Sequence, residues 1–267
     1  MTDLEKTNLL FFAAEPAKDE KKDEKKDNSV PVRRQLAVEF LGTYALALTA
    51  SASGDAAAIG FVLVALVYAF SDISRGHFNP AVTMAVFVND IVNDIVNKKN
   101  YTNWLTPFKY VLAQFLGALL GGLQHMFVLK DKDMTFGEEN IPTVQAGVSK
   151  TSALISELTA TMIFTVVILN VTTVKARAPI TTVKARAPNP FFGIAIGFAL
   201  TAAIAAVGDI SGGCLNPALG TVLPALAGKT DDIWIYVVGP LLGGVLGALF
   251  FRCTTDPKEL LEITTED

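Results

Sequence analysis

The tripeptide Asn-Pro-Ala occurs twice in the chain, once as Asn79, Pro80 and Ala81 and again as Asn216, Pro217 and Ala218. Asparagine is a good helix N-cap because its side-chain oxygen accepts a free backbone N–H of the first turn, and proline is well tolerated at the first helical position. Each tripeptide, called an asparagine box below, therefore predicts the start of a helix. The apolar run after each box is about ten residues long, too short to cross a bilayer, so we expect two half-spans.

Two helix starts that face each other inside a membrane predict a water-filled pore that repels cations. Irregular backbone survives in a bilayer only where it is buried in protein or lines a wet cavity, so facing boxes indicate an aqueous pore. Each helix N-terminus carries about half a positive charge, and the pair would repel a cation about 5 Å away by about 3 kcal/mol at an effective dielectric of about 20. We expect the amide NH2 groups of Asn79 and Asn216 to donate into the lumen, where a water held as an acceptor relays protons poorly.

The segments that must hold the boxes are strongly apolar. Of the 267 residues, 51% are hydrophobic, and the mean hydropathy is +0.42, values that are typical of membrane proteins. A helix needs about 20 mostly apolar residues to cross a bilayer. Six segments qualify: 35–53, 56–72, 107–129, 151–171, 189–208 and 232–252.

The two halves of the sequence resemble each other, which predicts an internal repeat. The pattern Glu39-Phe-Leu-Gly-Thr in the first span is echoed by Glu157-Leu-Thr-Ala-Thr in the fourth. An odd number of spans inverts the second copy, so the half-spans enter from opposite faces and meet at the midplane. We predict an all-α membrane protein, with six transmembrane helices and two half-helices in an inverted repeat. Its expected parts are a disordered tail (1–33), a first repeat (34–129), an extracellular loop (130–150), a second repeat (151–252) and a C-terminal tail (253–267).

The charged residues predict the orientation and exclude several kinds of partner. The connection between the fourth and fifth spans is basic and has no acidic residue, so this side and both termini should be cytoplasmic, in a plasma membrane or a vacuolar or vesicle membrane. A net charge of −4 argues against a nucleic-acid partner. Two histidines are too few for a metal cluster, and no cofactor is expected. No nucleophile, base and orienting group can be assembled, so an enzyme is not expected.

Two short segments are duplicated in predicted connections. TTVKARAP occurs at 172–179 and 181–188, and VNDI occurs at 88–91 and 92–95. One interpretation is a recent duplication without function, because insertions in connections cost little. The other is a gate at 171–190 that folds over the pore mouth or binds anionic headgroups, with phosphorylation of Thr173 or Thr182 as a trigger. The basic residues of that gate would be Lys175, Arg177, Lys184 and Arg186.

The chain resembles the aquaporins, the major intrinsic protein family. The resemblance lies in residues 37–48 (AVEFLGTYALAL), 74–86 (SRGHFNPAVTMAV), 197–220 (GFALTAAIAAVGDISGGCLNPALG) and 238–249 (VGPLLGGVLGAL). It implies a homotetramer in membrane lipid with one pore per subunit. It further implies that Glu39 and Glu157 accept hydrogen bonds from the half-span loops. His77 would either line the pore or support its loop.

The resemblance also locates a selectivity filter near the extracellular mouth, at Ile59, Ile204, Gly213 and Leu219. Most members have arginine after the second box, where this chain has Leu219. The four residues offer no side-chain hydrogen bond to a permeant, and by the Coulomb estimate above the missing arginine removes a barrier of about 3 kcal/mol against cations. We therefore expect a passive channel for water and small uncharged solutes such as glycerol, urea, ammonia and hydrogen peroxide.

Three alternatives remain open. The first is a water pore that tolerates leucine in its filter. The second is a protein of this fold with little or no water conduction, because it is gated closed, forms junctions or leaks ions. The third is a secondary transporter, a class that also uses inverted repeats and broken helices but usually places ionisable coupling groups at the site.

Overall fold

The computed structural model describes residues 30–98, 102–129, 140–174 and 189–256. Six helices of this part are long and apolar enough to cross a membrane: α2 (Val32–Ser53), α3 (Ala56–Ser74), α5 (Leu105–Gln124) with the π-helix η1 (His125–Leu129), α6 (Lys150–Thr173), α7 (Phe192–Ser211) and α9 (Ile233–Thr254). Two further helices, α4 (Pro80–Asn97) and α8 (Pro217–Leu226), begin at the boxes. The predicted all-α class with six spans and two shorter helices is confirmed.

The observed span boundaries differ from the predicted ones by up to three residues. The fifth span begins at Phe192 rather than at 189, because Pro190 lacks an N–H and the Asn189 side chain accepts a hydrogen bond from the Phe191 N–H in a turn before the helix. It ends at Ser211, because the next residue, Gly212, has a φ of 86° in the left-handed region that stops helices. The first span begins at Val32, so the tail predicted at 1–33 is too long by two residues, and its first 29 residues lie outside the described part.

The two half-span helices differ in length, which the sequence interpretation missed. Helix α8 has the expected 10 residues, but α4 has 18 and includes both copies of VNDI, which were predicted to lie in a connection. The run VNDIVNDIVN contains neither glycine nor proline, so nothing interrupts the helix before Lys98, where φ is 52°. The Asp94 carboxylate then accepts hydrogen bonds from the backbone N–H and the hydroxyl of Thr102, at 2.7 and 2.6 Å. The duplication therefore lengthens a helix.

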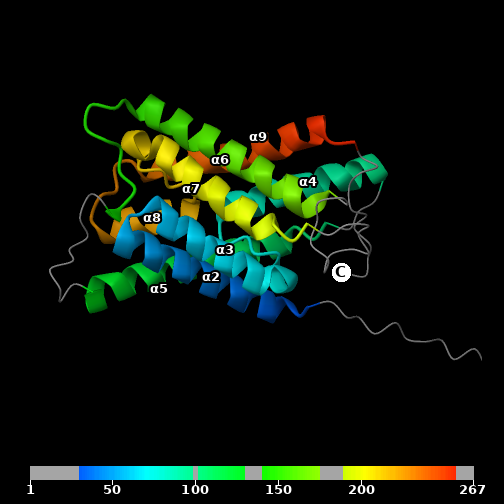
Figure 1. Cartoon of the computed structure of the whole chain (residues 1–267), viewed down its shortest axis with the longest axis horizontal. Coiled ribbons are helices and arrows are strands. Elements are labelled where there is room, and N and C mark those ends of the chain that lie inside the picture. The colour runs from blue at the N-terminus through cyan, green and yellow to red at the C-terminus, as the bar shows by residue number, and fades with distance from the viewer. Residues whose placement is uncertain (1–29, 99–101, 130–139, 175–188, 257–267) are drawn as a thin grey trace, which may run out of the picture. The chain divides into compact units, whose positions relative to one another are not determined.

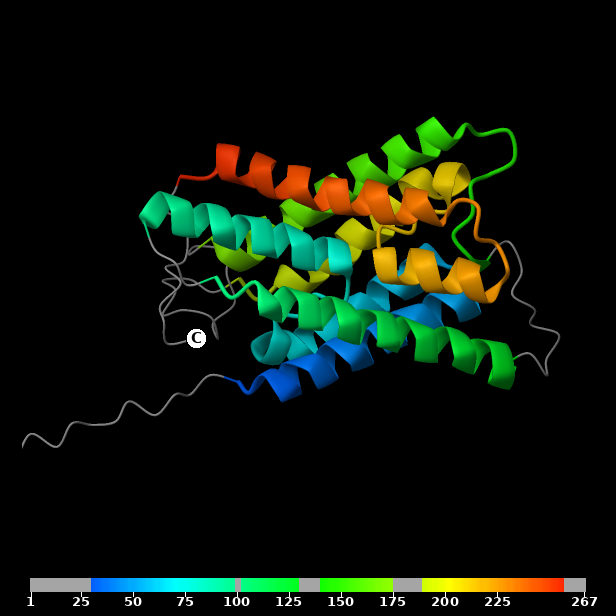
Figure 2. The ribbon, with the colours of Figure 1, turned by 180° about the vertical axis from the view of Figure 1, so that it is seen from behind.

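Glycines allow the long helices to approach one another closely, and the pattern is the same in both repeats. Helix α2 lies beside α5 in the first repeat, and α6 lies beside α9 in the second (Figure 1, Figure 2). A Cβ on Gly117 would overlap the carbonyl oxygen of Phe40, and one on Gly243 would overlap that of Leu158. Small residues at such contacts permit the tight backbone packing that associates helices in lipid.

The two repeats are interlocked through their half-span helices. Helix α4 of the first repeat packs on α9 of the second, and α8 of the second packs on α5 of the first. A Cβ on Gly244 would lie 2.5 Å from the carbonyl oxygen of Ala81, so α9 touches the first turn of α4. In Figure 2, α4 and α8 lie nearly end to end between the long helices. The long helices thus hold the starts of α4 and α8 against each other.

A single methyl group at the α2–α5 contact tests this packing. Gly117→Ala would press a Cβ into the Phe40 carbonyl oxygen, and we expect such overpacking to cost about 1–3 kcal/mol. The measurement is the thermal unfolding midpoint in detergent. The matched control is Gly208→Ala, because a Cβ there has no heavy atom within 4 Å. Equal midpoints for the two variants would contradict the close α2–α5 contact.

Candidate pore and its filter

Both asparagines cap the helices that follow them. The Asn79 side-chain oxygen accepts a hydrogen bond from the Ala81 N–H at 2.8 Å, and that of Asn216 accepts one from the Ala218 N–H at 3.0 Å. Helices α4 and α8 then begin at Pro80 and Pro217. The caps that the sequence predicts are therefore present, and the positive ends of both helix dipoles point toward the asparagines.

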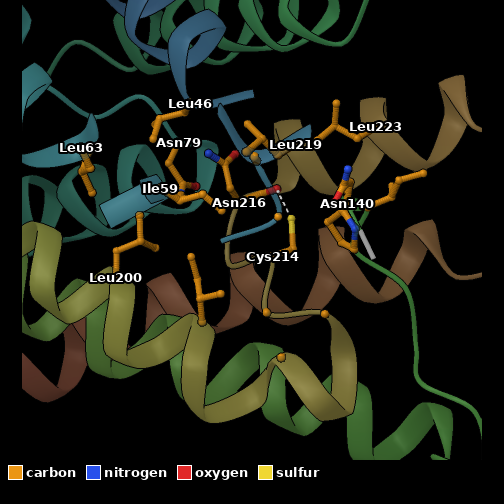
Figure 3. Close-up of a pocket in the computed structure, with 18 of the residues that line it drawn as sticks. Leu46, Ile59, Leu63, Asn79, Asn140, Leu200, Cys214, Asn216, Leu219 and Leu223 are labelled. Atoms are coloured by element: carbon orange, nitrogen blue, oxygen red, sulfur yellow. Dashed lines mark hydrogen bonds between the residues drawn. The ribbon is translucent and has the colours of Figure 1, made fainter. Parts of the chain in front are cut away.

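The two asparagines also tie the loops together. The Asn79 amide nitrogen donates to the Leu215 carbonyl oxygen at 2.9 Å, and that of Asn216 donates to the Phe78 carbonyl oxygen at 3.0 Å. Figure 3 shows the two side chains next to each other. Each NH2 group has two hydrogens, so one from each amide is used inside the protein and one remains for the lumen. The sequence interpretation did not anticipate the bond inside the protein, and the expected donation of the other hydrogen into the lumen stays a prediction.

Two buried carboxylates hold the loops that make these bonds. Glu39 accepts hydrogen bonds from the backbone N–H groups of His77 (3.0 Å) and Phe78 (2.7 Å), and its side chain is 0% exposed. Phe78 has a φ of 50°, a left-handed conformation that costs free energy in a bulky residue. The carboxylate bonds to consecutive N–H groups offset that cost and turn the Phe78 carbonyl toward Asn216.

The second loop repeats this arrangement. Glu157, also 0% exposed, accepts from the N–H groups of Cys214 (2.9 Å) and Leu215 (2.8 Å), and Leu215 has a φ of 53°. A serine hydroxyl adds a 2.7 Å bond to each carboxylate, from Ser74 to Glu39 and from Ser211 to Glu157. The bracing role that the resemblance implies for both glutamates agrees with this geometry.

The hydrogen bonds accepted by Glu39 and by Glu157 differ in one donor. The Gln114 side chain on α5 donates to Glu39 at 2.8 Å. Tyr110 and Tyr236 bond the equivalent carbonyls of Ser74 and Ser211, but four residues after Tyr236 the chain has Pro240 where Gln114 stands in the first repeat. Within the described part, Glu39 thus accepts from four groups and Glu157 from three.

A cavity of about 360 Å³ runs along the asparagines. Its walls include all four predicted filter residues, Ile59 from α3, Ile204 from α7, Gly213 from the second loop and Leu219 from α8. Gly213 has a φ of 62°, and a Cβ there would lie 2.9 Å from the Ile204 carbonyl oxygen, so only glycine fits. The cavity also reaches Asn79 and Asn216 (Figure 3), and His77 is among its lining residues.

The segment before α6 contributes to the mouth of this cavity, and the sequence interpretation did not assign it a role. Asn140, Ile141 and Gln145 line the cavity, and Ile141 is only 4% exposed. The Gln145 N–H donates to the Ile210 carbonyl oxygen at 3.1 Å, which attaches the segment to the end of α7. The sequence did contain one indication that this segment is packed on the protein, which is an isoleucine followed by proline in an otherwise polar loop. Asn140 adds a polar side chain to a cavity wall whose four predicted filter residues have none.

Charge in the described cavity wall is sparse and negative. Among the described lining residues, Asp209 is the one acidic side chain, and no lysine or arginine is present. Cys214 also borders the cavity, but its thiol donates to the Asn216 carbonyl oxygen at 3.2 Å (Figure 3). A cation entering the mouth would therefore meet no fixed positive side chain there before the helix dipoles at the asparagines.

Most of the predicted gate lies outside the described residues. This holds for Lys175, Arg177, Lys184, Arg186 and Thr182. Thr173 is in the last turn of α6, is 7% exposed and donates its hydroxyl to the Leu169 carbonyl oxygen. A kinase could reach this hydroxyl only after the end of α6 had opened, and the gate stays a prediction.

Comparisons with known proteins agree with this geometry. A family model described as Major intrinsic protein matches residues 50–251. "Aquaporin NIP1-1" of Zea mays is 32% identical over 88% of this chain and 80% of that protein, and "Probable aquaporin TIP2-2" of Arabidopsis thaliana is 34% identical over 76% and 75%. "Glycerol uptake facilitator protein-like 6" of Lactiplantibacillus plantarum is 29% identical over 82% and 97%. The aquaglyceroporin structure from Plasmodium falciparum superposes with a TM-score of 0.63 at 19% identity, covering 84% of this chain and 97% of that one.

Replacing one carboxylate oxygen by an amide NH2 tests whether Glu39 and Glu157 support the two loops. In Glu39→Gln or Glu157→Gln, the amide NH2 would face a backbone N–H, and we expect the unpaired donor to cost about 1–3 kcal/mol. The thermal unfolding midpoint should fall in both variants, and water permeability in proteoliposomes should fall with it because the asparagines lose their position. Asp231→Asn, at an exposed site, is the control. Unchanged midpoints in both glutamine variants would show that the carboxylates do not support the loops.

Proposed function

The chain belongs to the major intrinsic protein family, whose members are membrane channels for water or small solutes and not enzymes, and we propose that its own permeants are small and uncharged. They include water, glycerol, urea, ammonia and hydrogen peroxide. The observation that carries this proposal is the cavity in which two capped helix starts face each other, with Asn79 and Asn216 in its wall. A reconstituted channel should conduct these solutes down their gradients without ion coupling.

The facing asparagines supply the proposed exclusion of protons and cations. One free N–H on each amide can donate to a permeating water, and the two helix dipoles place about one positive charge beside it. A water that accepts from both amides directs its hydrogens away from the centre, so a proton cannot pass along a continuous chain of donors. Because no lysine or arginine lines the described cavity, we assign most of the cation barrier to this centre.

The filter residues support a preference for solutes less polar or larger than water. Ile59, Ile204 and Leu219 present hydrocarbon to the lumen, so a permeant there bonds to backbone groups or to its neighbours in file. Replacing arginine by Leu219 removes both donors and a fixed charge from this level. A glycerol facilitator and an aquaglyceroporin are among the similar proteins, which is consistent with passage of a polyol.

The chain is an integral membrane protein, and we propose its orientation, assembly and location from the sequence. The basic connection after α6 supports cytoplasmic termini. A homotetramer with one pore per subunit and a place in the plasma membrane or in a vacuolar or vesicle membrane follow from the resemblance. Besides the other subunits, the proposed partner of the chain is membrane lipid.

One alternative is supported by a specific observation. Asp209 is acidic and lines the mouth, while arginine is absent from the filter, so cations meet a weaker barrier than in members that carry arginine. A pore that leaks ions, or one held closed, would both fit this fold. A secondary transporter is less well supported, because the boxes at the predicted midplane are neutral.

We also propose that residues 171–190 form a gate on the cytoplasmic side. The support is the basic charge of the segment and the burial of Thr173 and Val174 where α6 ends, at 7% and 2% exposure. Val174 belongs to the hydrophobic core, and the Thr173 hydroxyl donates to the Leu169 carbonyl oxygen, so the start of the segment is attached to the helices. The competing interpretation remains a duplication without function.

Leu219→Arg tests the filter assignment. Stopped-flow light scattering on proteoliposomes should show faster water and several-fold slower glycerol, because the guanidinium narrows the mouth and adds donors. Any cation current in planar bilayers should fall about a hundredfold, since a barrier of about 3 kcal/mol is restored. Leu219→Met is the volume-matched control. If arginine altered neither water nor glycerol flux, the filter would lie elsewhere.

Deletion of 181–188 tests the gate. Removing this second copy of TTVKARAP leaves the first copy in place, and a gating segment that is shortened should raise basal water permeability severalfold. A second variant, with Lys184 and Arg186 both changed to glutamine, keeps the length and removes the charge. Wild-type rates in both variants would identify the duplication as functionless.

A further inference from the structure

The last turns of α4 have their polar side chains turned inward and their apolar side chains turned outward. Asn89, Asn93 and Asp94 are 4%, 8% and 7% exposed, whereas Ile95 and Val96 are 71% and 51% exposed. With 3.6 residues per turn, the asparagines and aspartates of the two VNDI copies lie on one side of the helix and the valines and isoleucines on the opposite side. A helix that borders water on its outer side has the reverse arrangement.

The aspartates of this stretch are bonded within the protein. Asp90 accepts a hydrogen bond from the Arg75 guanidinium at 3.3 Å, and Asp94 accepts one from the Thr102 N–H at 2.7 Å. At the exposed end of α4 the charged side chain is therefore a cation, that of Lys98. Exposed apolar side chains followed by a lysine are typical of a helix at a membrane surface, where the lysine meets anionic headgroups.

The length of α4 brings its apolar end to the depth of the lipid headgroups. Helix α8 has 10 residues and is about 15 Å long, which equals half of a hydrocarbon core of about 30 Å. Helix α4 begins at the same predicted midplane, and Ile95 stands about 22 Å along it from Pro80. The headgroup layer extends about 5–7 Å beyond the hydrocarbon core. Ile95 therefore reaches the outer part of this layer if α4 is upright and lies within the layer if α4 is tilted.

The neighbours of α4 indicate that it lies on a lipid-facing side of the protein. Helix α4 lies between α9 and α5 in Figure 2 and contacts both of them. Both neighbours are long and apolar enough to cross a membrane. Each carries exposed large apolar side chains along its length: Phe108, Leu112 and Leu116 on α5, and Leu242, Leu246 and Phe250 on α9. Two helices with lipid-facing side chains thus flank α4.

The start of α5 adds an aromatic side chain at the same end. Thr102, which bonds Asp94, brings the residues before α5 beside the end of α4. Trp104 follows two residues later at the N-cap of α5 and is 72% exposed. Tryptophan is enriched where the membrane meets water. Ile95, Val96 and Trp104 are called the α4 surface below.

We propose that the α4 surface is a contact site for the headgroup layer of the cytoplasmic leaflet. Its partner is the lipid bilayer, which takes the apolar side chains beside the acyl-chain ends and pairs anionic headgroups with Lys98. The second VNDI copy supplies both Asp94 and Ile95, so the duplicated segment provides the bond to Thr102 and the lipid contact together. The proposal goes beyond the channel function and does not depend on conduction.

The first test measures the depth of position 95 in the bilayer. Ile95→Cys is made in a full chain that carries Cys253→Ser, because Cys253 is exposed and Cys214 is buried. After nitroxide labelling and reconstitution in vesicles of phosphatidylcholine and phosphatidylglycerol, electron paramagnetic resonance measures collisions with oxygen, which concentrates in lipid, and with a water-soluble nickel chelate. Leu116→Cys on α5 is the lipid control, and Ala146→Cys, at an exposed site before α6, is the aqueous control.

We expect the ratio of oxygen to nickel collisions at position 95 to be severalfold higher than at position 146 and to approach the ratio at position 116. A ratio equal to that at position 146 would place the α4 surface in water. Few collisions with either reagent would show that a protein, such as a second copy of this chain, covers it. Either result would overturn the proposal.

The second test uses the fluorescence of Trp104. The chain has 2 tryptophans, so Trp234→Phe leaves Trp104 as the emitting residue. Lipids brominated near the carbonyl end of the acyl chain should quench this emission severalfold more strongly than lipids brominated near the methyl end, because the ring lies at the headgroup level. Absence of quenching by both lipids, or equal quenching by both, would contradict the proposed depth.

Discussion

The fold depends on two carboxylates that are buried among apolar helices. Glu39 and Glu157 each accept hydrogen bonds from two consecutive backbone N–H groups, and the second residue of each pair, Phe78 or Leu215, has a positive φ. An ionised carboxylate in lipid is costly unless it is fully hydrogen-bonded, and the N–H groups of a loop inside a bilayer are costly unless they are accepted. Each cost is offset by the other, and the helix starts are fixed as a result.

The interlocked repeats extend that constraint across the molecule. Each asparagine amide bonds a carbonyl of the opposite loop, and each half-span helix packs on a long helix of the opposite repeat. A shift of one loop would therefore move the acceptor of the other. The centre of the pore behaves as one unit made from residues more than 130 positions apart in the sequence.

Local rules predicted the parts of the site whose geometry is local. An asparagine before a proline specifies a cap and a helix start, and the observed helices begin where these pairs stand. The length of α4 was missed because a polar run of valine, asparagine and aspartate was taken as a connection, although it contains no residue that stops a helix. Asn140, Ile141 and the Gln114 bond to Glu39 were missed because their roles depend on tertiary contacts that no spacing in the sequence reveals. The roles of the filter and gate residues remain predictions.

The replacement of a glutamine by Pro240 gives the two loops unequal support. The loop with fewer anchors carries Gly213 and leads into Leu219, whereas the better-anchored loop carries His77. With one hydrogen bond fewer on its carboxylate, the second loop is the one that a nearby substitution can displace at lower cost. Under the proposed filter assignment, such substitutions would change which solutes pass and leave the first loop where it is.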